Sequence, residues 1–478
     1  MMHTHSFPLA VAVVTTVAIG VSVAARGGTS TDVARAKGGG TRLVDERVIP
    51  PLPKLLNVRE QYELRVKWLE RKHQALLPMM RRHGISMWIV VNEEFHNDPV
   101  TEYVVPPLTY VSRRDVITFV DGAAEGLKAF SNYGRPTSDY TRFVQPFPVP
   151  ANERGLQDTR DGLRRMFDKY KPRTIALALG GERGQDSGLS RDSHQFLLEA
   201  LGPDAESRIV PAAPLIEEYL DTRLPDELEY YRAAVLTTDI LAQRALSNEV
   251  ITPGKTRAAD VKWFFNDQIA RLGVAAEPWF EIHVAVQRFD PSTGDVIPYV
   301  HPAPDDLVFQ RGDVIHLDCG FNYLGFATDW QKVAYILREG ETDVTPGMKQ
   351  ALKNGNITQD AIRTASRPGM TGYEATVAAM QELKGVSFLP SLYSHPIGYQ
   401  GHGLGPNINA RNGVIGAKPE RDSVLRLGSY RSIELSATTA VPEWNGKKLL
   451  IPFEDDAHLT EKGYEWFRPP QTSWYLIR

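Results

Sequence analysis

The chain has 478 residues, of which 42% are hydrophobic and 23% are charged, proportions that exclude a disordered or collagen-like protein. Lysine and arginine total 54 against 58 acidic residues, a net charge of −4, and nucleic-acid binding usually needs a strongly basic domain instead. The single cysteine, Cys319, excludes an intramolecular disulfide and a cysteine-rich zinc module. Any metal site must therefore use histidine, aspartate and glutamate. The length predicts two or three domains.

The first 25 residues predict a signal peptide. Residues 7–25 carry no charge and end in small residues, which is typical of the apolar region before a cleavage site. An uncleaved anchor is the alternative, because this run is just long enough to span a bilayer. We therefore expect a protein exported to the periplasm or secreted, with no membrane span after processing. Residues 26–55 lack periodicity and are rich in Gly, Thr, Arg and Pro, so we expect a linker there.

Residues 56–222 are expected to form an α/β domain. Three short apolar runs are typical of buried strands: residues 86–92, 116–122 and 174–181. Residues 156–171 form an amphipathic helix between two of these strands, which indicates α/β alternation. A first helix is expected over 59–84, interrupted at Pro78 and closed by Gly84. No glycine-rich phosphate loop follows the strands, so the sequence gives no support for a nucleotide site.

Residues 223–478 contain a weak internal repeat. A long helix, expected from about Asp226 to Asn248, is followed by a Pro-Gly-x-Thr turn over 253–256, and the same turn returns over 368–371. Thr256 is expected to cap the helix that follows it. Each turn precedes a strand-rich segment with acidic residues, which suggests a duplicated α+β unit. A duplicated unit that folds on itself would place a site at its pseudo-twofold axis.

Two aspartates, Asp318 and Asp329, lie in an apolar hairpin expected over 312–337. Glycines and an asparagine between them provide the turn, and the second strand is expected to resume at Phe326. Aspartate is disfavoured in strands. Either residue alone would be interpreted as a hydrogen-bond acceptor in a loop, but together with the groups that follow, metal ligation explains them better.

More ligand candidates follow. His395 and His402 lie seven residues apart among glycines, and Glu434 and Glu454 each lie in an apolar, strand-like segment. A buried carboxylate is costly unless it is paired or metal-bound. Four carboxylates and an imidazole suit two ions about 3.5–4 Å apart, the arrangement used in aminopeptidases. Manganese, cobalt, iron and zinc all fit such ligands, and manganese is weakly favoured.

With these motifs the chain resembles the "pita-bread" metallopeptidase family, which includes methionine aminopeptidase, aminopeptidase P, prolidase and the metal-free creatinase. The family's ligand order is Asp, Asp, His, Glu, Glu, and it is matched by Asp318, Asp329, His395, Glu434 and Glu454. His402 and His301 occupy the family's two flanking histidine positions. The resemblance covers roughly 223–475, and the preceding segment is similar to the N-terminal domain of aminopeptidase P and prolidase. It implies a pita-bread catalytic domain over 223–478.

The resemblance also implies a mechanism. Asp329 and Glu454 would bridge two divalent ions, and a water between the ions would become the nucleophile at neutral pH. Glu434 would take the proton of this water and pass it to the leaving amine. His402 and His301 would form hydrogen bonds with the scissile carbonyl or the oxyanion.

Some positions depart from the family pattern. Gln331-Lys332 replaces the usual Thr-Arg pair, and Leu435-Ser436 replaces Pro-Gly. Ser391 and Pro452 stand where prolyl-specific members often have a histidine and an arginine. The metal ligands are thus retained, while residues behind them and around the substrate differ. An Xaa-Pro preference is therefore one option among several.

The function that follows is a dinuclear metallopeptidase acting on peptide N-termini or dipeptides, with no nucleic-acid partner and a homodimer expected by analogy. A metal-free, creatinase-like hydrolase and a non-enzymatic binding module are the alternatives. His316 alternates in phase with Asp318 and could face the site, but it is interpreted as a hydrogen-bonded strand histidine. Cys319 is interpreted as a small buried filler. His283 lies in a segment that resembles a strand lining the substrate pocket.

Overall fold

The computed structural model describes residues 42–478, apart from 46, 110–112, 133–136, 149–155 and 182. The predicted signal peptide over 1–25 lies outside the described residues. Within the predicted linker, β1 (Arg42–Val44) and β2 (Arg47–Ile49) pair as a short antiparallel sheet, so this part has regular structure that we did not expect. Gly40–Arg478 forms one compact unit. Among the described residues, none of the helices combines the length and apolar character that a membrane crossing requires.

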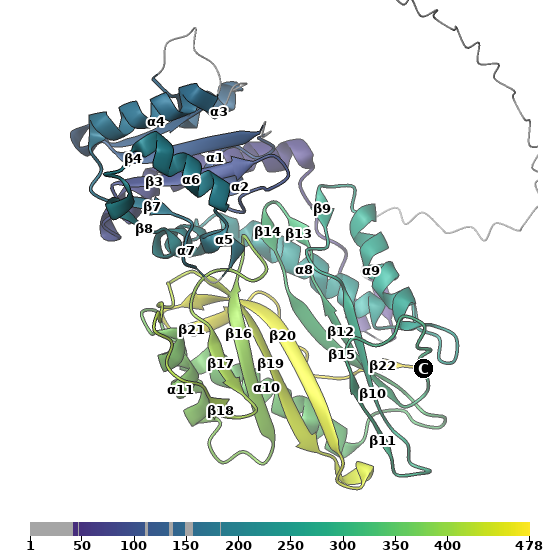
Figure 1. The fold of residues 1–478 in the computed structure, drawn as a ribbon. Helices are drawn as coiled ribbons and strands as arrows, with labels where there is room; N and C mark the ends of the chain where they lie inside the picture. The colour runs from purple at the N-terminus through teal and green to yellow at the C-terminus, as the bar shows by residue number, and fades with distance from the viewer. Residues whose placement is uncertain (1–41, 46, 110–112, 133–136, 149–155, 182) are drawn as a thin grey trace, which may run out of the picture. The chain divides into compact units, whose positions relative to one another are not determined.

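In the part of the chain that the structure describes, the α/β region contains a mixed six-stranded sheet in the order β6-β5-β4-β3-β7-β8. Its strands are β3 (Met87–Glu93), β4 (Arg114–Asp121), β5 (Leu127–Ser131), β6 (Gln145–Pro146), β7 (Ile175–Leu177) and β8 (Ile209–Pro211). Its helices are α1 (Val58–Arg82), α2 (Thr101–Val104), α3 (Ser138–Phe143), α4 (Leu156–Tyr170), α5 (Gly184–Ser187), α6 (Arg191–Leu201) and α7 (Ala213–Asp221). The three predicted strands and the helix between them are all present (Figure 1).

The two faces of this sheet pack in different cores. Trp88 on β3 belongs to the core that includes α1 and α7, whereas its neighbour Ile89 belongs to the core that includes α4 and α6. Successive side chains of a strand point to opposite faces, so β3 is apolar along its whole length because both of its faces are covered.

Helix α1 differs from its prediction. Asn57 accepts hydrogen bonds from the N–H groups of Arg59 and Glu60, and the Glu60 carboxylate accepts from the Asn57 N–H, which closes a capping box. The helix then continues through Pro78 to Arg82, so the predicted interruption was wrong. Burial of the side chains next to the proline outweighs the loss of one backbone hydrogen bond.

Residues 223–478, the predicted catalytic domain and below called the catalytic region, are built on a large, mainly antiparallel sheet. Its order for the described residues is β11-β10-β12-β15-β20-β19-β16-β17-β18, with β21 added beside β20 and β22 beside β15. Its strands are β10 (His283–Phe289), β11 (Val296–Val300), β12 (Asp313–Cys319), β15 (Trp330–Ile336), β16 (Leu389–Ile397), β17 (Ile408–Arg411), β18 (Val414–Ile415), β19 (Tyr430–Ala440), β20 (Lys448–Thr460), β21 (Gly463–Trp466) and β22 (Tyr475–Ile477). Two helix pairs accompany it, namely α8 (Glu227–Ala245) with α9 (Ala258–Arg271), and α10 (Pro346–Ala365) with α11 (Gly372–Glu382).

The internal duplication is visible in this order. Helices α8 and α9 precede β10, β11, β12 and β15, and helices α10 and α11 precede β16, β17, β19 and β20. The two halves join where β15 pairs with β20, at Gln331 and Glu454. This seam lies in the middle of the sheet, where the predicted pseudo-twofold axis would place a site.

Two local predictions were wrong. Arg257 occupies the N-cap position of α9, where its N–H donates to the Asp260 carboxylate. The Thr256 hydroxyl instead donates to the Val250 carbonyl and accepts from the Thr252 N–H within the preceding turn. The second strand of the hairpin does not resume at Phe326 but at Trp330. In between, β13 (Asn322–Tyr323) and β14 (Phe326–Ala327) pair with each other, and β13 pairs with β9 (Ala276–Glu277), in a separate small sheet.

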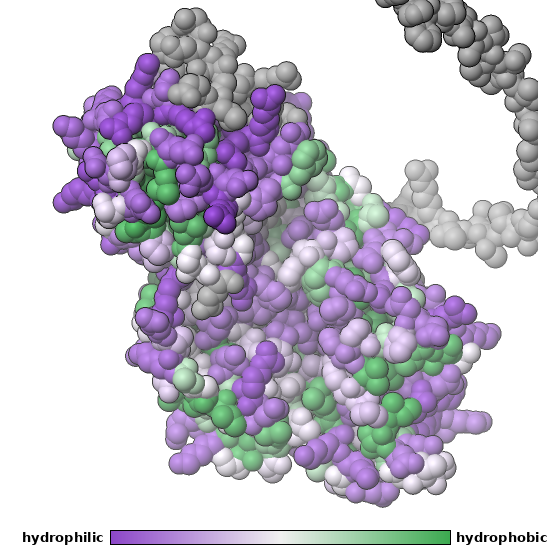
Figure 2. Space-filling model, in the orientation of Figure 1, coloured by the Kyte–Doolittle hydropathy of each residue, from purple (hydrophilic) through white to green (hydrophobic). Residues whose placement is uncertain are grey.

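The largest core cluster is shared by both regions. It includes Trp88 and Tyr219 from the α/β region and Leu241, Trp330 and Tyr430 from the catalytic region. On the face shown in Figure 2, hydrophobic side chains lie in small groups between hydrophilic ones. Most of the large apolar side chains are thus used in packing the sheets and their helices together.

Candidate active site

The five predicted ligands lie on five neighbouring strands of the large sheet. Asp318 is on β12, Asp329 directly precedes β15, His395 is on β16, Glu434 is on β19 and Glu454 is on β20. The register places Glu434 opposite Glu454, and Gln331 opposite both Glu454 and Asp318. Strand pairing therefore brings together residues that are far apart in the sequence.

The ligand atoms of these residues converge in two overlapping clusters. Asp318, Asp329 and Glu454 form one cluster, and His395, Glu434 and Glu454 form the other, with the atoms of each cluster within 4.8 Å of one another. His395 Nε2 lies 3.3 Å from Glu454 Oε1, 3.8 Å from Glu434 Oε2 and 3.8 Å from Asp329 Oδ2. Glu454 belongs to both clusters, so its carboxylate lies at the centre of the group.

The electrostatics of the group favour a bound cation. Burial, followed by the negative charge of Glu454, raises the pKa of Asp318, Asp329 and Glu434 well above the usual range. Burial also opposes ionisation of Glu454, but its hydrogen bond and charge interaction with His395 bring the pKa of Glu454 below its usual value. A divalent ion among these carboxylates would relieve their repulsion. The donor set of oxygens and one imidazole thus fits the metal ions that the sequence predicts.

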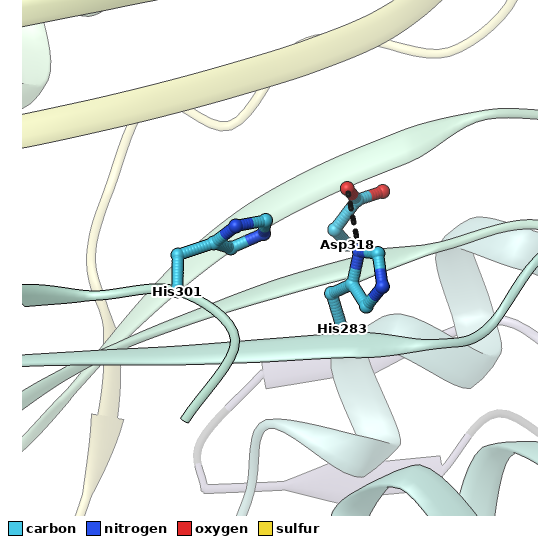
Figure 3. A group of neighbouring side chains, drawn as sticks. All are labelled: His283, His301 and Asp318. Carbon is cyan, nitrogen blue, oxygen red and sulfur yellow. Dashed lines mark ion pairs between the residues drawn. The ribbon is translucent and has the colours of Figure 1, made fainter. Parts of the chain in front are cut away.

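A third cluster lies beside Asp318. His283, at the start of β10, and His301, which follows β11, have ring nitrogens within 4.8 Å of each other and of an Asp318 oxygen. His283 Nδ1 and Asp318 Oδ2 are 4.0 Å apart (Figure 3). The predicted catalytic residue His301 therefore lies next to a predicted metal ligand, and so does His283.

His402 approaches the centre from another side. Its ring packs edge-on against His395, at 4.6 Å between centroids, and against Trp279, at 5.2 Å. A side chain at Gly401 would clash with the Trp279 ring, so glycine allows this close packing. Arg183 Nη1 from the α/β region donates to the His402 carbonyl at 2.7 Å.

A cleft of about 350 Å³ opens on the centre. Its lining includes three predicted site residues, His301, Asp318 and Glu434, and also Ser391 and Pro452, two of the positions that depart from the family pattern. The rest of its lining is formed by Tyr299, His316, Gln331, Tyr393, Arg411, Asn412, Ser436 and Leu450. The cleft therefore presents both the ligand candidates and the divergent positions to a substrate.

Arg411 is the one permanently positive side chain in that lining, within the part of the chain that the structure describes. It ends β17, and its guanidinium carbon lies 4.1 Å from the centroid of the Tyr393 ring. Its charge also acts on Glu434, whose pKa it lowers in opposition to burial and the neighbouring carboxylates. Sequence reasoning missed this residue, because its position depends on how β17 pairs with β16.

Gln331 was noted in the sequence as a departure from the family pattern, but its contacts were not predicted. Its Nε2 donates to Glu434 Oε1 and to Glu454 Oε2, each at 2.8 Å, and its Oε1 lies 3.0 Å from His316 Nε2. His316 Nδ1 in turn lies 2.7 Å from the Tyr299 hydroxyl. Burial lowers the pKa of His316 to about 3. His316 is thus hydrogen-bonded on its strand, as predicted, and it also faces the cleft, which was the alternative.

Cys319 is fully buried, with its sulfur 3.5 Å from the Trp330 carbonyl oxygen. Burial raises the pKa of the Cys319 thiol well above its usual value, which disfavours the nucleophilic thiolate. The prediction of a small buried filler is confirmed.

A comparison with known families matches residues 229–461 to the metallopeptidase family M24. These residues, just under half of the chain, resemble metallopeptidase family M24. The match covers all five ligand candidates and both flanking histidines, and it confirms the predicted family and the predicted class of enzyme, a metallopeptidase.

Individual proteins resemble the chain at low identity. An uncharacterised peptidase of Bacillus subtilis (strain 168), YqhT, is 21% identical over 266 residues, which are 54% of this chain and 65%, less than two thirds, of that relative. The X-Pro aminopeptidase of Thermotoga maritima MSB8 has a TM-score of 0.59 and 19% identity, over 84% of this chain and 100% of that structure. The Xaa-Pro dipeptidase of Bacillus anthracis has a TM-score of 0.60 and 16% identity, over 86% and 100%. These likenesses confirm the predicted fold class, an α/β region followed by a pita-bread region.

Proposed function

We propose that the chain is a dinuclear metal-dependent peptidase that cleaves dipeptides or similarly short peptides. The observation that carries the proposal is the pair of overlapping clusters, which share the Glu454 carboxylate. A carboxylate common to two sets of ligands suits two ions about 3.5–4 Å apart. Membership of a metallopeptidase family supports amide hydrolysis as the reaction.

The chain's own residues divide the ligation between two positions. Asp318 would hold one ion and His395 and Glu434 the other, and Asp329 and Glu454 lie close enough to both sets to be shared. Bound divalent ions supply Lewis-acid activation of a water molecule and of the substrate carbonyl. Manganese, cobalt, iron and zinc all suit these oxygen and imidazole donors.

Glu434 is the residue we assign to proton transfer. The Gln331 amide donates to its Oε1, and its Oε2 lies 3.8 Å from His395 Nε2, among the other ligand candidates. The carboxylate can take a proton from the attacking water and deliver it to the leaving amine. His301 and His402, which flank the centre, can donate hydrogen bonds to the carbonyl oxygen as it becomes negative.

The position of Arg411 favours a short substrate with a free C-terminal carboxylate. Arg411 brings a positive charge into a cleft that otherwise contains the carboxylates Asp318 and Glu434. A guanidinium binds a carboxylate strongly, so the free C-terminal carboxylate of a dipeptide would be held there. Ser391 and Pro452 line the cleft where prolyl-specific members often have a histidine and an arginine. They support a substrate preference that does not require proline, although two similar structures are named as Xaa-Pro peptidases.

Metal analysis of the purified protein tests the metal centre. We expect about two transition-metal ions per chain, since a shared carboxylate suits a two-metal site, and loss of both in Asp329→Ala. A wild-type protein without metal would contradict the proposal and favour a metal-free hydrolase or a binding module.

A substrate panel tests the specificity. Dipeptides with a free C-terminus should be cleaved faster than their C-terminal amides and faster than longer peptides. Efficient cleavage of Xaa-Pro dipeptides alone would contradict the expected lack of dependence on proline. Cleavage of amides and free acids at equal rates would contradict the role of Arg411.

A further inference from the structure

We propose that Tyr299, His316 and Gln331 form a positioning chain that orients the two glutamates of the metal centre, Glu434 and Glu454. The three side chains come from β11, β12 and β15 and are not themselves ligand candidates. The inference rests on the proposed function, because the orientation of the glutamates has a chemical consequence only if they bind metal.

The order of donors and acceptors in the positioning chain is set at Gln331. One end of its amide lies 2.8 Å from Glu434 Oε1 and 2.8 Å from Glu454 Oε2. Carboxylate oxygens only accept hydrogen bonds when ionised, so this end must be the NH₂ group. The opposite orientation would place three acceptors together without a hydrogen between them. Gln331 therefore uses both of its amide hydrogens on the two glutamates.

The same argument extends to the histidine. The amide oxygen of Gln331 can only accept, so the His316 Nε2 atom, 3.0 Å away, carries the proton. In a neutral ring the other nitrogen, Nδ1, is then an acceptor, and the Tyr299 hydroxyl 2.7 Å away donates to it. Each contact has one donor and one acceptor, so the ring and the amide have one satisfied orientation.

The fixed orientation of Gln331 determines which oxygen of each glutamate is left to face the metal centre. Gln331 binds Oε1 of Glu434 and Oε2 of Glu454. The other oxygens, Glu434 Oε2 and Glu454 Oε1, lie 3.8 and 3.3 Å from His395 Nε2. Each glutamate thus has one oxygen held by Gln331 and the other turned toward His395, and Glu454 Oε1 also accepts a hydrogen bond from the Ser432 hydroxyl. Partners of this kind keep ligands in place, and their loss typically weakens metal binding by about 10- to 100-fold.

Gln331 needs His316 as its hydrogen-bond donor. The threonine usual at this position in the family would offer one hydroxyl hydrogen, whereas Gln331 offers two and reaches both glutamates. The longer side chain also brings a buried carbonyl oxygen, which needs a donor. His316, on the neighbouring strand β12, provides it. The amide oxygen that Gln331 brings into the core is therefore paired with a histidine of the adjacent strand.

A double-mutant cycle, with metal affinity as the measured quantity, tests the positioning chain. Gln331→Met removes the amide at similar volume, and His316→Leu removes the donor to it. Metal affinity is measured for manganese and for zinc by competition with a chromophoric chelator. We expect a loss of about 10- to 100-fold in Gln331→Met, a smaller loss in His316→Leu, and no further loss in the double variant. His316→Gln, which retains a donor, should keep an affinity close to that of the wild type.

Gln287→Met is the matched control. Gln287 is a buried glutamine of β10 whose amide contacts only main-chain atoms of β20, at Lys448 and Leu450, in the hydrogen bonds that the structure describes. Its replacement should change stability but not metal affinity.

Three outcomes would overturn the proposal: unchanged affinity in Gln331→Met, additive losses in the double variant, or equal losses in His316→Gln and His316→Leu. The His316 pair decides the question even if Gln331→Met does not fold. A wild-type protein that binds no metal would remove the proposed function and this inference together. A wild-type protein that binds metal as tightly as the variants do would remove only this inference.

Discussion

Lys332 Nζ donates a hydrogen bond to Asp455 Oδ1 at 2.5 Å, and both side chains are buried at the seam between β15 and β20. The ammonium group also donates to the Glu454 carbonyl at 3.2 Å, and Gln359 Nε2 donates to Asp455 Oδ2 at 2.8 Å. The ion pair therefore joins the two halves of the catalytic region directly behind a predicted metal ligand.

Removing one partner of this ion pair should strongly destabilise the protein. Lys332→Met leaves the Asp455 charge buried without its cation, which typically costs about 3–5 kcal/mol. The free energy of unfolding, measured in urea, should fall by roughly that amount. The double variant Lys332→Met with Asp455→Asn should recover most of the loss, because no buried charge then remains. A single variant as stable as the wild type would show that water reaches the pair.

Glu434→Gln should separate chemistry from binding. The amide cannot take a proton from water, so kcat should fall by about 100- to 10,000-fold, the usual contribution of general acid–base catalysis. KM should change much less. Steady-state kinetics with a dipeptide and metal analysis of the same sample measure both effects. A variant with full metal content and unchanged kcat would rule out Glu434 as the proton-transfer residue.

Arg411→Ala should raise KM for dipeptides with a free C-terminus. A hydrogen bond to a charged group contributes about 1.5–3 kcal/mol, so KM should rise by roughly 10- to 100-fold. KM for the corresponding amides should stay the same. Arg160→Ala is the control, because Arg160 pairs with Glu199 in the α/β region. Equal effects on acids and amides would mean that Arg411 acts only through the overall charge of the cleft.

Arg183→Ala tests whether the α/β region contributes to the site. Arg183 Nη1 binds the His402 carbonyl, so its loss should let the His402 ring move relative to His395. We expect kcat to fall several-fold, since small misplacements of catalytic groups are costly, while metal content stays constant. An unchanged kcat would show that packing against Trp279 holds His402 by itself.

Asp115, on β4, should make stability depend on pH. Burial raises its pKa to about 7, and its Oδ2 atom is buried without a hydrogen-bond partner among the described residues. In the unfolded chain the pKa is about 3.9, so the folded protein binds the proton more tightly. The stability from this group is complete below about pH 3.9 and is lost as the pH rises through about 7, with a slope of at most about 1.4 kcal/mol per pH unit.

Asp115→Asn removes this titration. The variant should gain stability relative to the wild type as the pH rises from about 5 to 8, measured by urea unfolding at several pH values. Asp121→Asn is the control on the same strand, because the Arg81 guanidinium holds the pKa of Asp121 below its usual value. Its difference from the wild type should stay constant over this window. A flat difference for Asp115→Asn as well would show that the carboxyl is hydrated.

The ligand candidates could be predicted from the sequence because each one stands out in its own segment. Asp318, Glu434 and Glu454 are acidic residues in apolar strands, where they need a cation or a partner. The helix–helix–strand repeat was visible for a similar reason, because hydrophobic periodicity and turn residues are local signals.

What could not be predicted depends on strand register. Gln331 reaches Glu434 and Glu454 because β13 and β14 occupy the residues between the two aspartates, so that β15 pairs with β12 and β20 at one register. Nothing local in the sequence specifies this register. Thr256 likewise is a residue type that often caps helices, but its hydroxyl already accepts from the Thr252 N–H and donates to the Val250 carbonyl in the preceding turn.

The pairing of β22 with β15 has a consequence for how the sheet assembles. Along one edge β15 pairs with β12, and its other edge is shared by β20, at Gln331, and β22, at Ala334–Ile336. Strand β15 is therefore held by three segments, two of which lie far away in the sequence. Because these two contacts close long loops, the middle of the sheet should form late in folding, after local structure such as helix α8.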